Sequence, residues 1–287
     1  MGLVSVAQLM RRAEAEKYAV GAFNANNMEI VQGIIAAAEE VRSPVILQAS
    51  QGAIKYAGIA YIAGMVKIAA ENASVPIALH LDHGNSFEQN MRCIRYGFSS
   101  VMYDGSALPL EENIRMVNKV IEVARAVGVS VEGELGKIGG TEDDISVADK
   151  DAMYTVPQEA QYFVEQTKVD LLAVAIGTAH GPYKGGSPRL DLNRLSEIRA
   201  LIPHTPVVLH GASGVSDESV RECIARGVRK INIDTDLRQA FVWKMREIME
   251  ANPKEIDPRK IFAPAREALK EIVKSKMQLF GCAGQAD

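Results

Sequence analysis

The sequence predicts one domain over residues 1–287, a (β/α)8 TIM barrel of the α/β class with an extra N-terminal helix and a C-terminal helical extension at about 252–287. Short apolar runs alternate with longer amphipathic stretches along the whole chain, which is typical of parallel strands joined by helices. Eight such units in roughly 250 residues match the size of a closed barrel. An open doubly wound sheet is the alternative, but no Gly-x-Gly-x-x-Gly motif follows the first strand.

The strands are expected where short β-branched or apolar runs end in a polar residue or a glycine. The first strand follows an opening helix at about 4–15, and the third ends abruptly in the stretch His80-Leu81-Asp82-His83-Gly84. The expected strands are 19–23, 45–49, 76–79, 100–103, 129–134, 171–176, 206–209 and 230–233.

Helices are expected between the strands, each from its own signal. In the stretch 28–41, Ile30, Ile34 and Ala38 recur on one helical face. Acidic residues suit the first turn of 110–126, and Pro157 stands at a favoured position for opening a helix. The other expected helices are 59–71, 86–96, 192–201, 236–249 and 259–277. The Gly-rich segments 136–155 and 181–188 are expected to be loops.

Composition and charge exclude several classes of protein. The chain has a formal net charge of −4 and a sequence pI near 5.8, and it has no basic cluster of the kind that binds nucleic acid. No apolar run reaches the roughly 18 residues of a membrane span, and the N-terminus lacks the features of a signal peptide. The three cysteines are far apart, which favours reduced thiols in a cytoplasmic protein.

The expected barrel brings polar residues from distant positions to one rim. They all stand at or just beyond the C-terminal ends of strands, where the active sites of such barrels form. These residues are Asn24, Ser50, Asp82, His83, Asp104, Glu134, His180, His210, Asn232 and Asp234.

Three of the rim residues are histidines, and a glycine follows each of them directly. His83, His180 and His210 suit zinc, which in catalytic sites keeps three protein ligands and an open position. The alternative is that each is an ordinary hydrogen-bonded rim residue. Asp104 and Glu134 are candidates for further ligands or for the carboxylates that fix the imidazole tautomers.

Two acidic positions are candidates for proton transfer. Asp82 precedes a predicted ligand and suits a general acid/base, although it is also placed to cap the helix near Ser86. Glu142 lies in the segment 136–155, which is either a lid over the mouth or a solvated acidic loop.

An anion site is expected after the last two strands. The segments Gly211-Ala212-Ser213-Gly214 and Asn232-Ile233-Asp234-Thr235 lead into helices, and loops at these positions often bind phosphate through backbone N–H groups. Lys184, in a Gly-rich loop, adds a positive charge. A metal, a carboxylate and a phosphate site together indicate chemistry on a phosphorylated carbonyl compound, in which a divalent ion stabilises an enediolate.

The chain resembles the metal-dependent class II fructose-bisphosphate aldolases along nearly its whole length. The matching motifs are Tyr18-Ala19-Val20-Gly21-Ala22-Phe23-Asn24, Leu81-Asp82-His83-Gly84, Val131-Glu132-Gly133-Glu134-Leu135-Gly136, Gly139-Gly140, His180-Gly181 and Leu209-His210-Gly211. One departure is Ala212, where many relatives have a second glycine. The stretch Asp257-Pro258-Arg259-Lys260 favours the fructose branch over the related tagatose-1,6-bisphosphate aldolases.

The resemblance implies zinc-dependent reversible cleavage of fructose 1,6-bisphosphate into dihydroxyacetone phosphate and glyceraldehyde 3-phosphate, with cobalt and iron as alternative metals. It assigns zinc to His83, His180 and His210, and a second or displaced metal to Asp104 and Glu134. Asp82 would move the proton of the C4 hydroxyl, and Glu142 a proton at the dihydroxyacetone phosphate carbon.

The same resemblance implies how the substrate is held. Phosphate-site positions, with a monovalent cation (Na⁺ or K⁺) nearby, are Gly181, Gly211, Ala212, Ser213, Asn232, Ile233, Asp234 and Thr235. Asn24, at the end of the first expected strand, is a further candidate for substrate binding. The distant phosphate would meet Ser50, Lys184 and Arg238. Asp257 and Arg259 would reach a neighbouring copy's site, which implies a homo-oligomer, dimer or tetramer.

Three rival functions stay open from the residues. A Schiff-base (class I) aldolase needs a lysine at the rim, but Lys230 is expected at the opposite end of its strand and Lys184 in a loop. A zinc hydrolase needs no ketose-phosphate site. A non-catalytic metal-binding barrel does not need all of these acids and histidines.

Overall fold

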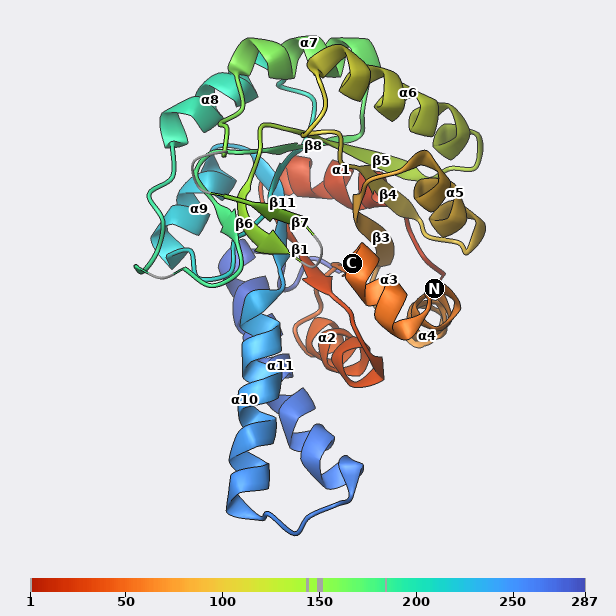
Figure 1. Cartoon of the computed structure of the whole chain (residues 1–287), viewed down its shortest axis with the longest axis vertical. Helices are drawn as coiled ribbons and strands as arrows, with labels where there is room; N and C mark the ends of the chain where they lie inside the picture. The colour runs from red at the N-terminus through yellow and green to blue at the C-terminus, as the bar shows by residue number, and fades with distance from the viewer. Residues whose placement is uncertain (1, 143–144, 149–151, 184, 287) are drawn as a thin grey trace.

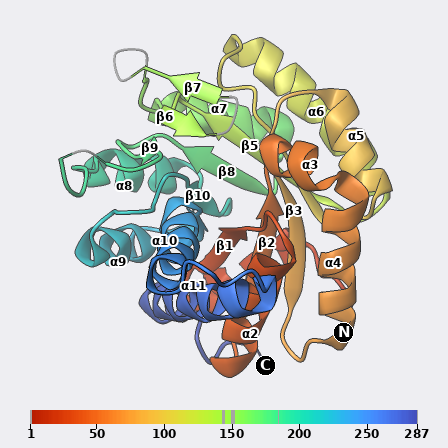
Figure 2. The same ribbon diagram turned by 60° about the horizontal axis from the view of Figure 1, so that its bottom comes forward.

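The computed structural model of the chain contains the predicted barrel, and it describes residues 2–142, 145–148, 152–183 and 185–286. Eight parallel strands close in the order β1-β11-β10-β8-β5-β4-β3-β2, which confirms the (β/α)8 prediction (Figures 1 and 2). The barrel strands are β1 (Val20–Asn24), β2 (Val45–Ala49), β3 (Ile77–Gly84), β4 (Ser100–Tyr103), β5 (Ser130–Leu135), β8 (Leu171–Val174), β10 (Val207–Leu209) and β11 (Val228–Ile233).

Helices surround the barrel, and most start and end within two residues of the predicted positions. Apolar side chains on one face of each helix pack against the strands, which is what the 3.6-residue spacing predicts. The helices are α1 (Val6–Glu16), α2 (Met28–Glu40), α3 (Gln51–Ala57), α4 (Ile59–Asn72), α5 (Phe87–Arg95), α6 (Leu110–Ala126), α7 (Pro157–Thr167), α8 (Leu192–Leu201), α9 (Asp217–Ala225), α10 (Thr235–Ala251) and α11 (Pro258–Phe280).

The last two helices form a long hairpin that projects from the barrel (Figure 1). Helix α10 begins at the rim after β11, and α11 returns along it and packs against α2. Among the described residues no single helix is long and apolar enough to cross a membrane. The pair α3 and α4, bent by 96°, passes that test only by combined length and composition.

The segment 136–155 is not simply a loop, and in this respect the prediction was wrong. Two short strands, β6 (Gly139–Glu142) and β7 (Ile145–Val147), pair antiparallel there, and β6 also pairs with β9 (Ala179–His180) (Figure 2). Gly140 has a φ of +92° and lies so close to His180 that a Cβ would meet its backbone. A small three-stranded sheet therefore joins this segment to a predicted metal ligand.

The barrel interior contains charged as well as apolar side chains. Glu132 and Lys230 are both fully buried, on β5 and β11 respectively. The expectation that Lys230 begins its strand at the far end of the barrel was wrong, since β11 begins at Val228 and Lys230 lies inside the strand. These two residues lie beneath the rim and take part in the site.

Candidate active site and metal centre

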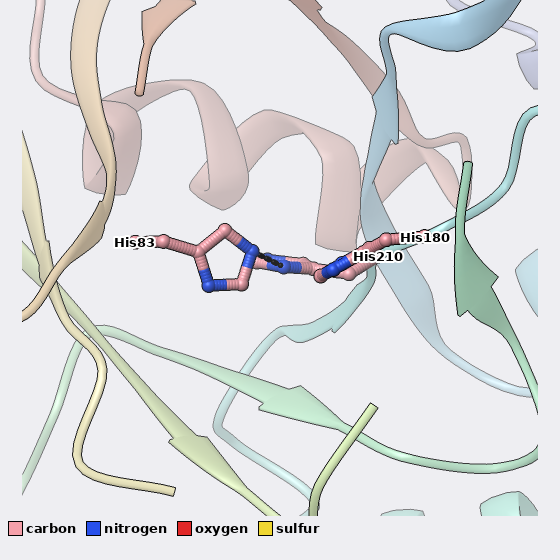
Figure 3. A group of neighbouring side chains, drawn as sticks. All are labelled: His83, His180 and His210. Carbon is pink, nitrogen blue, oxygen red and sulfur yellow. Dashed lines mark hydrogen bonds between the residues drawn. The ribbon is translucent and has the colours of Figure 1, made fainter. Parts of the chain in front are cut away.

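The three predicted histidine ligands meet at the rim (Figure 3). His83 comes from the end of β3, His180 from β9 and His210 directly after β10. The ring centroids of His83 and His210 are 4.6 Å apart, and those of His83 and His180 are 5.0 Å apart. The Nε2 atom of His83 and the Nδ1 atom of His210 are separated by 2.9 Å. His180 does not end a barrel strand, because β8 stops at Val174 and β9 holds this histidine instead.

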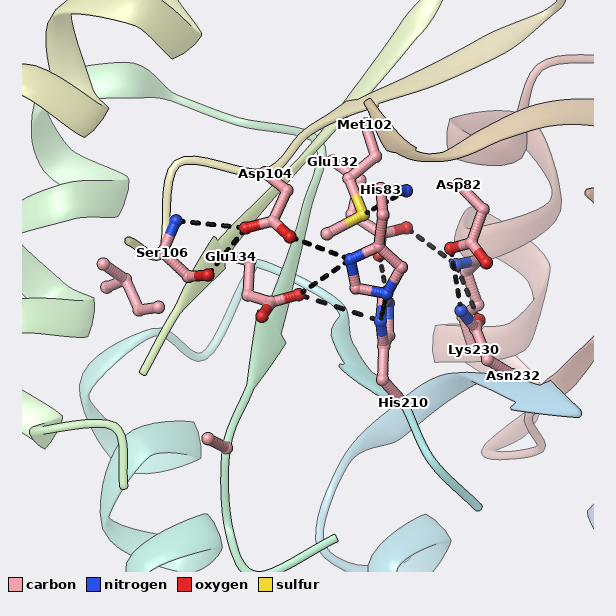
Figure 4. Close-up of polar contacts among 12 residues, drawn as sticks. Asp82, His83, Met102, Asp104, Ser106, Glu132, Glu134, His210, Lys230 and Asn232 are labelled. Atoms are coloured by element: carbon pink, nitrogen blue, oxygen red, sulfur yellow. Dashed lines mark hydrogen bonds and ion pairs between the residues drawn. The ribbon is translucent and has the colours of Figure 1, made fainter. Parts of the chain in front are cut away.

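Two carboxylates fix the orientation of two of these rings (Figure 4). Asp104 Oδ2 is 2.9 Å from Nδ1 of His83, and Glu132 Oε1 is 2.8 Å from Nε2 of His210. A carboxylate accepts hydrogen bonds, so the ring nitrogens facing these oxygens are the N–H donors. When both rings are neutral, the remaining nitrogens, Nε2 of His83 and Nδ1 of His210, carry the lone pairs that a cation accepts.

Electrostatics around the rings also fit a metal ion. Burial lowers the pKa of His180 and His210 well below the usual value, so both rings are neutral. Burial would lower the pKa of His83 too, but Asp82 and Asp104 raise it well above the usual value. The carboxylates of Asp82 and Asp104 thus favour a positive charge at His83, which is a proton on the ring or, in its place, a bound cation. Neutral imidazoles beside carboxylates are a donor set that zinc accepts.

Glu134 offers a further oxygen to the same site. Its Oε2 atom is buried and accepts no hydrogen bond from any residue that the structure describes. It lies 3.8 Å from Nδ1 of His83 and 3.7 Å from Nδ1 of His210. Ligand atoms of His83, Asp104 and Glu134 lie within 4.8 Å of one another, as do those of the three histidines. A buried carboxylate oxygen without a hydrogen bond is costly, and a cation would compensate it.

Asp82 and His83 both point into the barrel, although neighbouring residues of a strand normally point to opposite faces. The register between β3 and β4 shifts between Leu81 and Gly84, and His83 has a φ of +47°. This bulge breaks the usual alternation, so both side chains are buried. The alternative role of Asp82 as a helix cap is excluded, because Ser86 caps α5 itself through a 3.2 Å bond from the Gln89 N–H.

Amide side chains hold both oxygens of Asp82. Gln48 Nε2 donates to Oδ2 at 2.9 Å, and Asn232 Nδ2 donates to Oδ1 at 3.1 Å. Gln48 also donates to Oδ1 of Asn24 at 2.6 Å. Burial raises the pKa of Asp82, while His83 counteracts that shift. A carboxyl group fixed in this way, with a raised pKa, suits exchange of a proton with a bound substrate.

A cavity of about 240 Å³ opens beside the imidazoles where the phosphate site is predicted. Gly211 has a φ of +63°, and a Cβ there would lie 2.6 Å from the Ala179 oxygen. The N-terminus of α10 faces this cavity, and Arg238 pairs with Asp234 at 2.7 Å. Helix termini and arginine both favour anions. The cavity is lined by Asn24, Ala179, His180, Gly181, Pro182, Gly211, Ser213, Asn232, Asp234, Thr235 and Arg238.

Several residues that were predicted to bind substrate do not present their side chains to the cavity, or are not fully described by the structure. The side chains of Ala212 and Ile233 are packed in the core, so their backbones alone can face a ligand. Ser50 is buried and caps α3. Glu142 ends β6, where the structure describes its backbone, and Lys184 lies outside the described residues.

Asp257 and Arg259 lie far from their own barrel's rim. Asp257 caps α11 at the tip of the projecting hairpin, and it pairs with Arg259 at 2.8 Å (Figure 1). The Arg259 side chain is 89% exposed.

Sequence reasoning missed four residues that hold the site together. Glu132, Lys230 and Gln48 are polar residues inside buried strands, and that anomaly was a usable signal. Tyr183 follows the His180 motif, where its Oη accepts from the Ala179 N–H at 2.7 Å and donates to the Gly211 oxygen at 2.8 Å. The loop after β9, which contains Tyr183, and the loop after β10, which contains Gly211, are far apart in sequence and come together only in the folded chain.

Comparison with known proteins gives a consistent result. The family model for class-II fructose-bisphosphate aldolase matches residues 4–285. Fructose-bisphosphate aldolases of Thermus caldophilus (99% of this chain, 100% of the relative) and Geobacillus stearothermophilus (100% and 99%) are 50% and 46% identical. The crystal structure of the YdjI aldolase from Escherichia coli K12 superimposes with a TM-score of 0.87 at 34% identity, covering 99% of this chain and 100% of that one.

Proposed function

We propose roles for the site residues from the premise that this chain belongs to the class II fructose-bisphosphate aldolase family. It is a metal-dependent lyase of carbohydrate metabolism that acts on a sugar bisphosphate, and the comparisons do not favour the tagatose alternative. The geometry of the rim supports the individual roles of the metal ligands, the acid/base residues and the phosphate contacts.

The metal is zinc, held by His83, His180 and His210. The observation that carries this assignment is the 2.9 Å approach of two imidazole nitrogens whose opposite nitrogens are fixed by carboxylates. Asp104 and Glu134 offer oxygens for a second or displaced divalent ion. When bound, the metal supplies Lewis-acid stabilisation of negative charge on the substrate carbonyl. A monovalent cation, Na⁺ or K⁺, accompanies the phosphate in the cavity.

Asp82 removes the proton of the C4 hydroxyl. The C3–C4 bond then breaks, C4 becomes the aldehyde of glyceraldehyde 3-phosphate, and the electron pair stays with the other product. Glu142 delivers a proton to C3 of that product, which leaves as dihydroxyacetone phosphate. The burial of Asp82 and its two amide partners support the first role. The same groups act in reverse during aldol addition.

The cavity takes the phosphate of the dihydroxyacetone half, through the backbone at Gly181 and 211–213 and the segment 232–235. The opposite phosphate meets Ser50, Lys184 and Arg238, the last of which also lines this cavity. Asp257 and Arg259 of a second copy complete that end, so the active form is a homo-oligomer, a dimer or a tetramer. The projecting α10–α11 hairpin supports this arrangement because it carries both residues away from their own rim.

Two broader assignments belong to the same proposal. The chain acts as one domain over 1–287, and α10 and α11 pack on each other and on α2 as its extension. The three cysteines are free and buried, which supports a reducing, cytoplasmic location.

A coupled cleavage assay tests the function directly. Fructose 1,6-bisphosphate and tagatose 1,6-bisphosphate are compared, each with and without a chelator, followed by zinc readdition. We expect fructose bisphosphate to be cleaved faster, with activity lost on chelation and restored by zinc. Chelator-resistant turnover together with borohydride trapping of a substrate adduct would instead identify Schiff-base chemistry.

Subunit complementation tests the shared site. Inactive Asp82→Ala and Arg259→Ala chains are mixed under conditions in which subunits exchange. Activity should return, because some sites combine an intact Asp82 with the neighbour's intact Arg259. Demonstrated exchange without any recovered activity would contradict the shared site.

A further inference from the structure

A buried lysine takes part in the polar contacts beneath the rim, beside Asp82 and Asn232 (Figure 4). Lys230 Nζ is 2.9 Å from Oε2 of Glu132 and 2.8 Å from Oδ1 of Asn232. Lys230 and Glu132 have no exposed surface, and Asn232 is 7% exposed. The ammonium group is therefore held by one carboxylate and one amide inside the barrel.

Each of these two partners contacts a different part of the reaction centre. Glu132 reaches Nε2 of His210 through its other oxygen, at 2.8 Å. Asn232 donates its amide hydrogen to Oδ1 of Asp82 at 3.1 Å. A continuous path thus runs from a metal ligand to the proposed acid/base, and Lys230 is its central member.

Stability alone does not account for a lysine at this position. Replacing a buried ion pair with apolar side chains of similar volume is often neutral or even stabilising. The residues that pair with Lys230 on the two neighbouring strands, Val20 on β1 and Val208 on β10, are both apolar and buried. An apolar residue would fit the strand but would leave Glu132 and Asn232 without the group that orients them.

We propose that Lys230 is a positioning residue that sets the relative placement of His210 and Asp82, acting through Glu132 and Asn232. The ammonium fixes one oxygen of Glu132, so the other oxygen stays directed at His210. It also fixes Oδ1 of Asn232, so the amide N–H stays directed at Asp82. The inference rests on the proposed roles of His210 and Asp82.

Lys230→Met tests the proposal, because methionine keeps much of the volume and removes the charge. Loss of groups that orient metal ligands typically lowers metal affinity or activity by about 10–100-fold. We expect such a loss in zinc affinity, measured by competition with a chromophoric chelator, and a similar fall in kcat with little change in KM. The visible spectrum of the cobalt-substituted protein should also change, since His210 is no longer held in place.

Arg229→Met is the matched control. Arg229 is the adjacent residue of β11 and is also buried, but its guanidinium contacts Glu14 at 3.2 Å and the Ile224 and Val228 oxygens. The variant removes a buried cation from the same strand without touching the path to the site. It should lower the unfolding temperature yet keep the zinc affinity, the cobalt spectrum and kcat.

The double variant Glu132→Gln/Lys230→Met separates charge balance from positioning. It removes both charges, so we expect it to unfold at a higher temperature than Lys230→Met while zinc affinity and kcat stay low. Zinc affinity and kcat within twofold of the wild type, in either variant, would overturn the inference. Failure of the proposed function itself would look different, because the wild-type protein would then show no chelator-sensitive cleavage of the bisphosphate.

Discussion

Replacing Asp82 with asparagine isolates its proposed role in proton transfer. General acid/base catalysis typically contributes about 10²–10⁴-fold, which corresponds to roughly 2.7–5.4 kcal/mol of activation free energy. Asp82 contacts Gln48 and Asn232 and is absent from both clusters of candidate metal ligands. We therefore expect kcat to fall by that factor while the bound zinc remains stoichiometric.

The neighbouring amides allow this substitution with little cost to the fold. Gln48 Oε1 and Asn24 Nδ2 are buried without a hydrogen-bond partner among the described residues. If both amides turn over, Gln48 accepts from the introduced NH₂ group and from Asn24. The expected loss of stability is about 1 kcal/mol, whereas alanine would leave two buried donors unpaired at about 1–3 kcal/mol each.

The assay couples dihydroxyacetone phosphate formation to NADH oxidation, with zinc content and unfolding temperature measured on the same samples. The reasoning is refuted if kcat falls less than tenfold in a fully zinc-loaded variant. It is also refuted if zinc and activity disappear in parallel, because Asp82 would then be a support for His83.

Three further predictions follow from the same structure. Chelation should abolish cleavage and leave the helical circular dichroism nearly unchanged, since a barrel of this size buries its core without a metal; loss of the helical signal would contradict this. Tyr183→Phe should raise KM and weaken zinc binding, since it removes two bonds worth about 1–3 kcal/mol together that tie Ala179 to Gly211; unchanged KM and zinc affinity would show that the loops hold without the hydroxyl. Burial raises the pKa of Cys93 and Cys223 to about 12 and of Cys282 to about 11, so all three thiols stay protonated at pH 8 and should react with Ellman's reagent only after unfolding; rapid reaction of the native protein would refute this.

The barrel was predictable because its signals are local. Alternating apolar runs and helix-opening residues such as Pro157 predict elements that the structure confirms, and the position of each strand end then places His83 and His210 at one rim. The strand that carries His180 was not predictable, because β9 is two residues long and exists only through pairing with β6. A strand of two residues is too short to show the alternation of apolar and polar residues that predicts longer strands.

The supporting residues escaped prediction for a related reason. The bulge at His83 turns both Asp82 and His83 inward, which alternation alone would not predict. Glu132 and Lys230 face each other from β5 and β11, which are far apart in sequence and are not neighbours in the barrel. Contacts across the barrel interior depend on the side-chain layers of the closed sheet rather than on any local pattern.

The location of His180 on β9 predicts that metal occupancy and local opening are thermodynamically linked. Two histidines are attached to the barrel wall, whereas the third belongs to a strand that can separate from β6 without breaking a barrel strand pair. Zinc at about 100 times its dissociation constant would add roughly 2.7 kcal/mol to the free energy of any opening that releases the ion. Amide hydrogen exchange in β6 and β9 should therefore slow by up to about 100-fold when zinc is added, while exchange that requires only fraying of α10 and α11 stays the same.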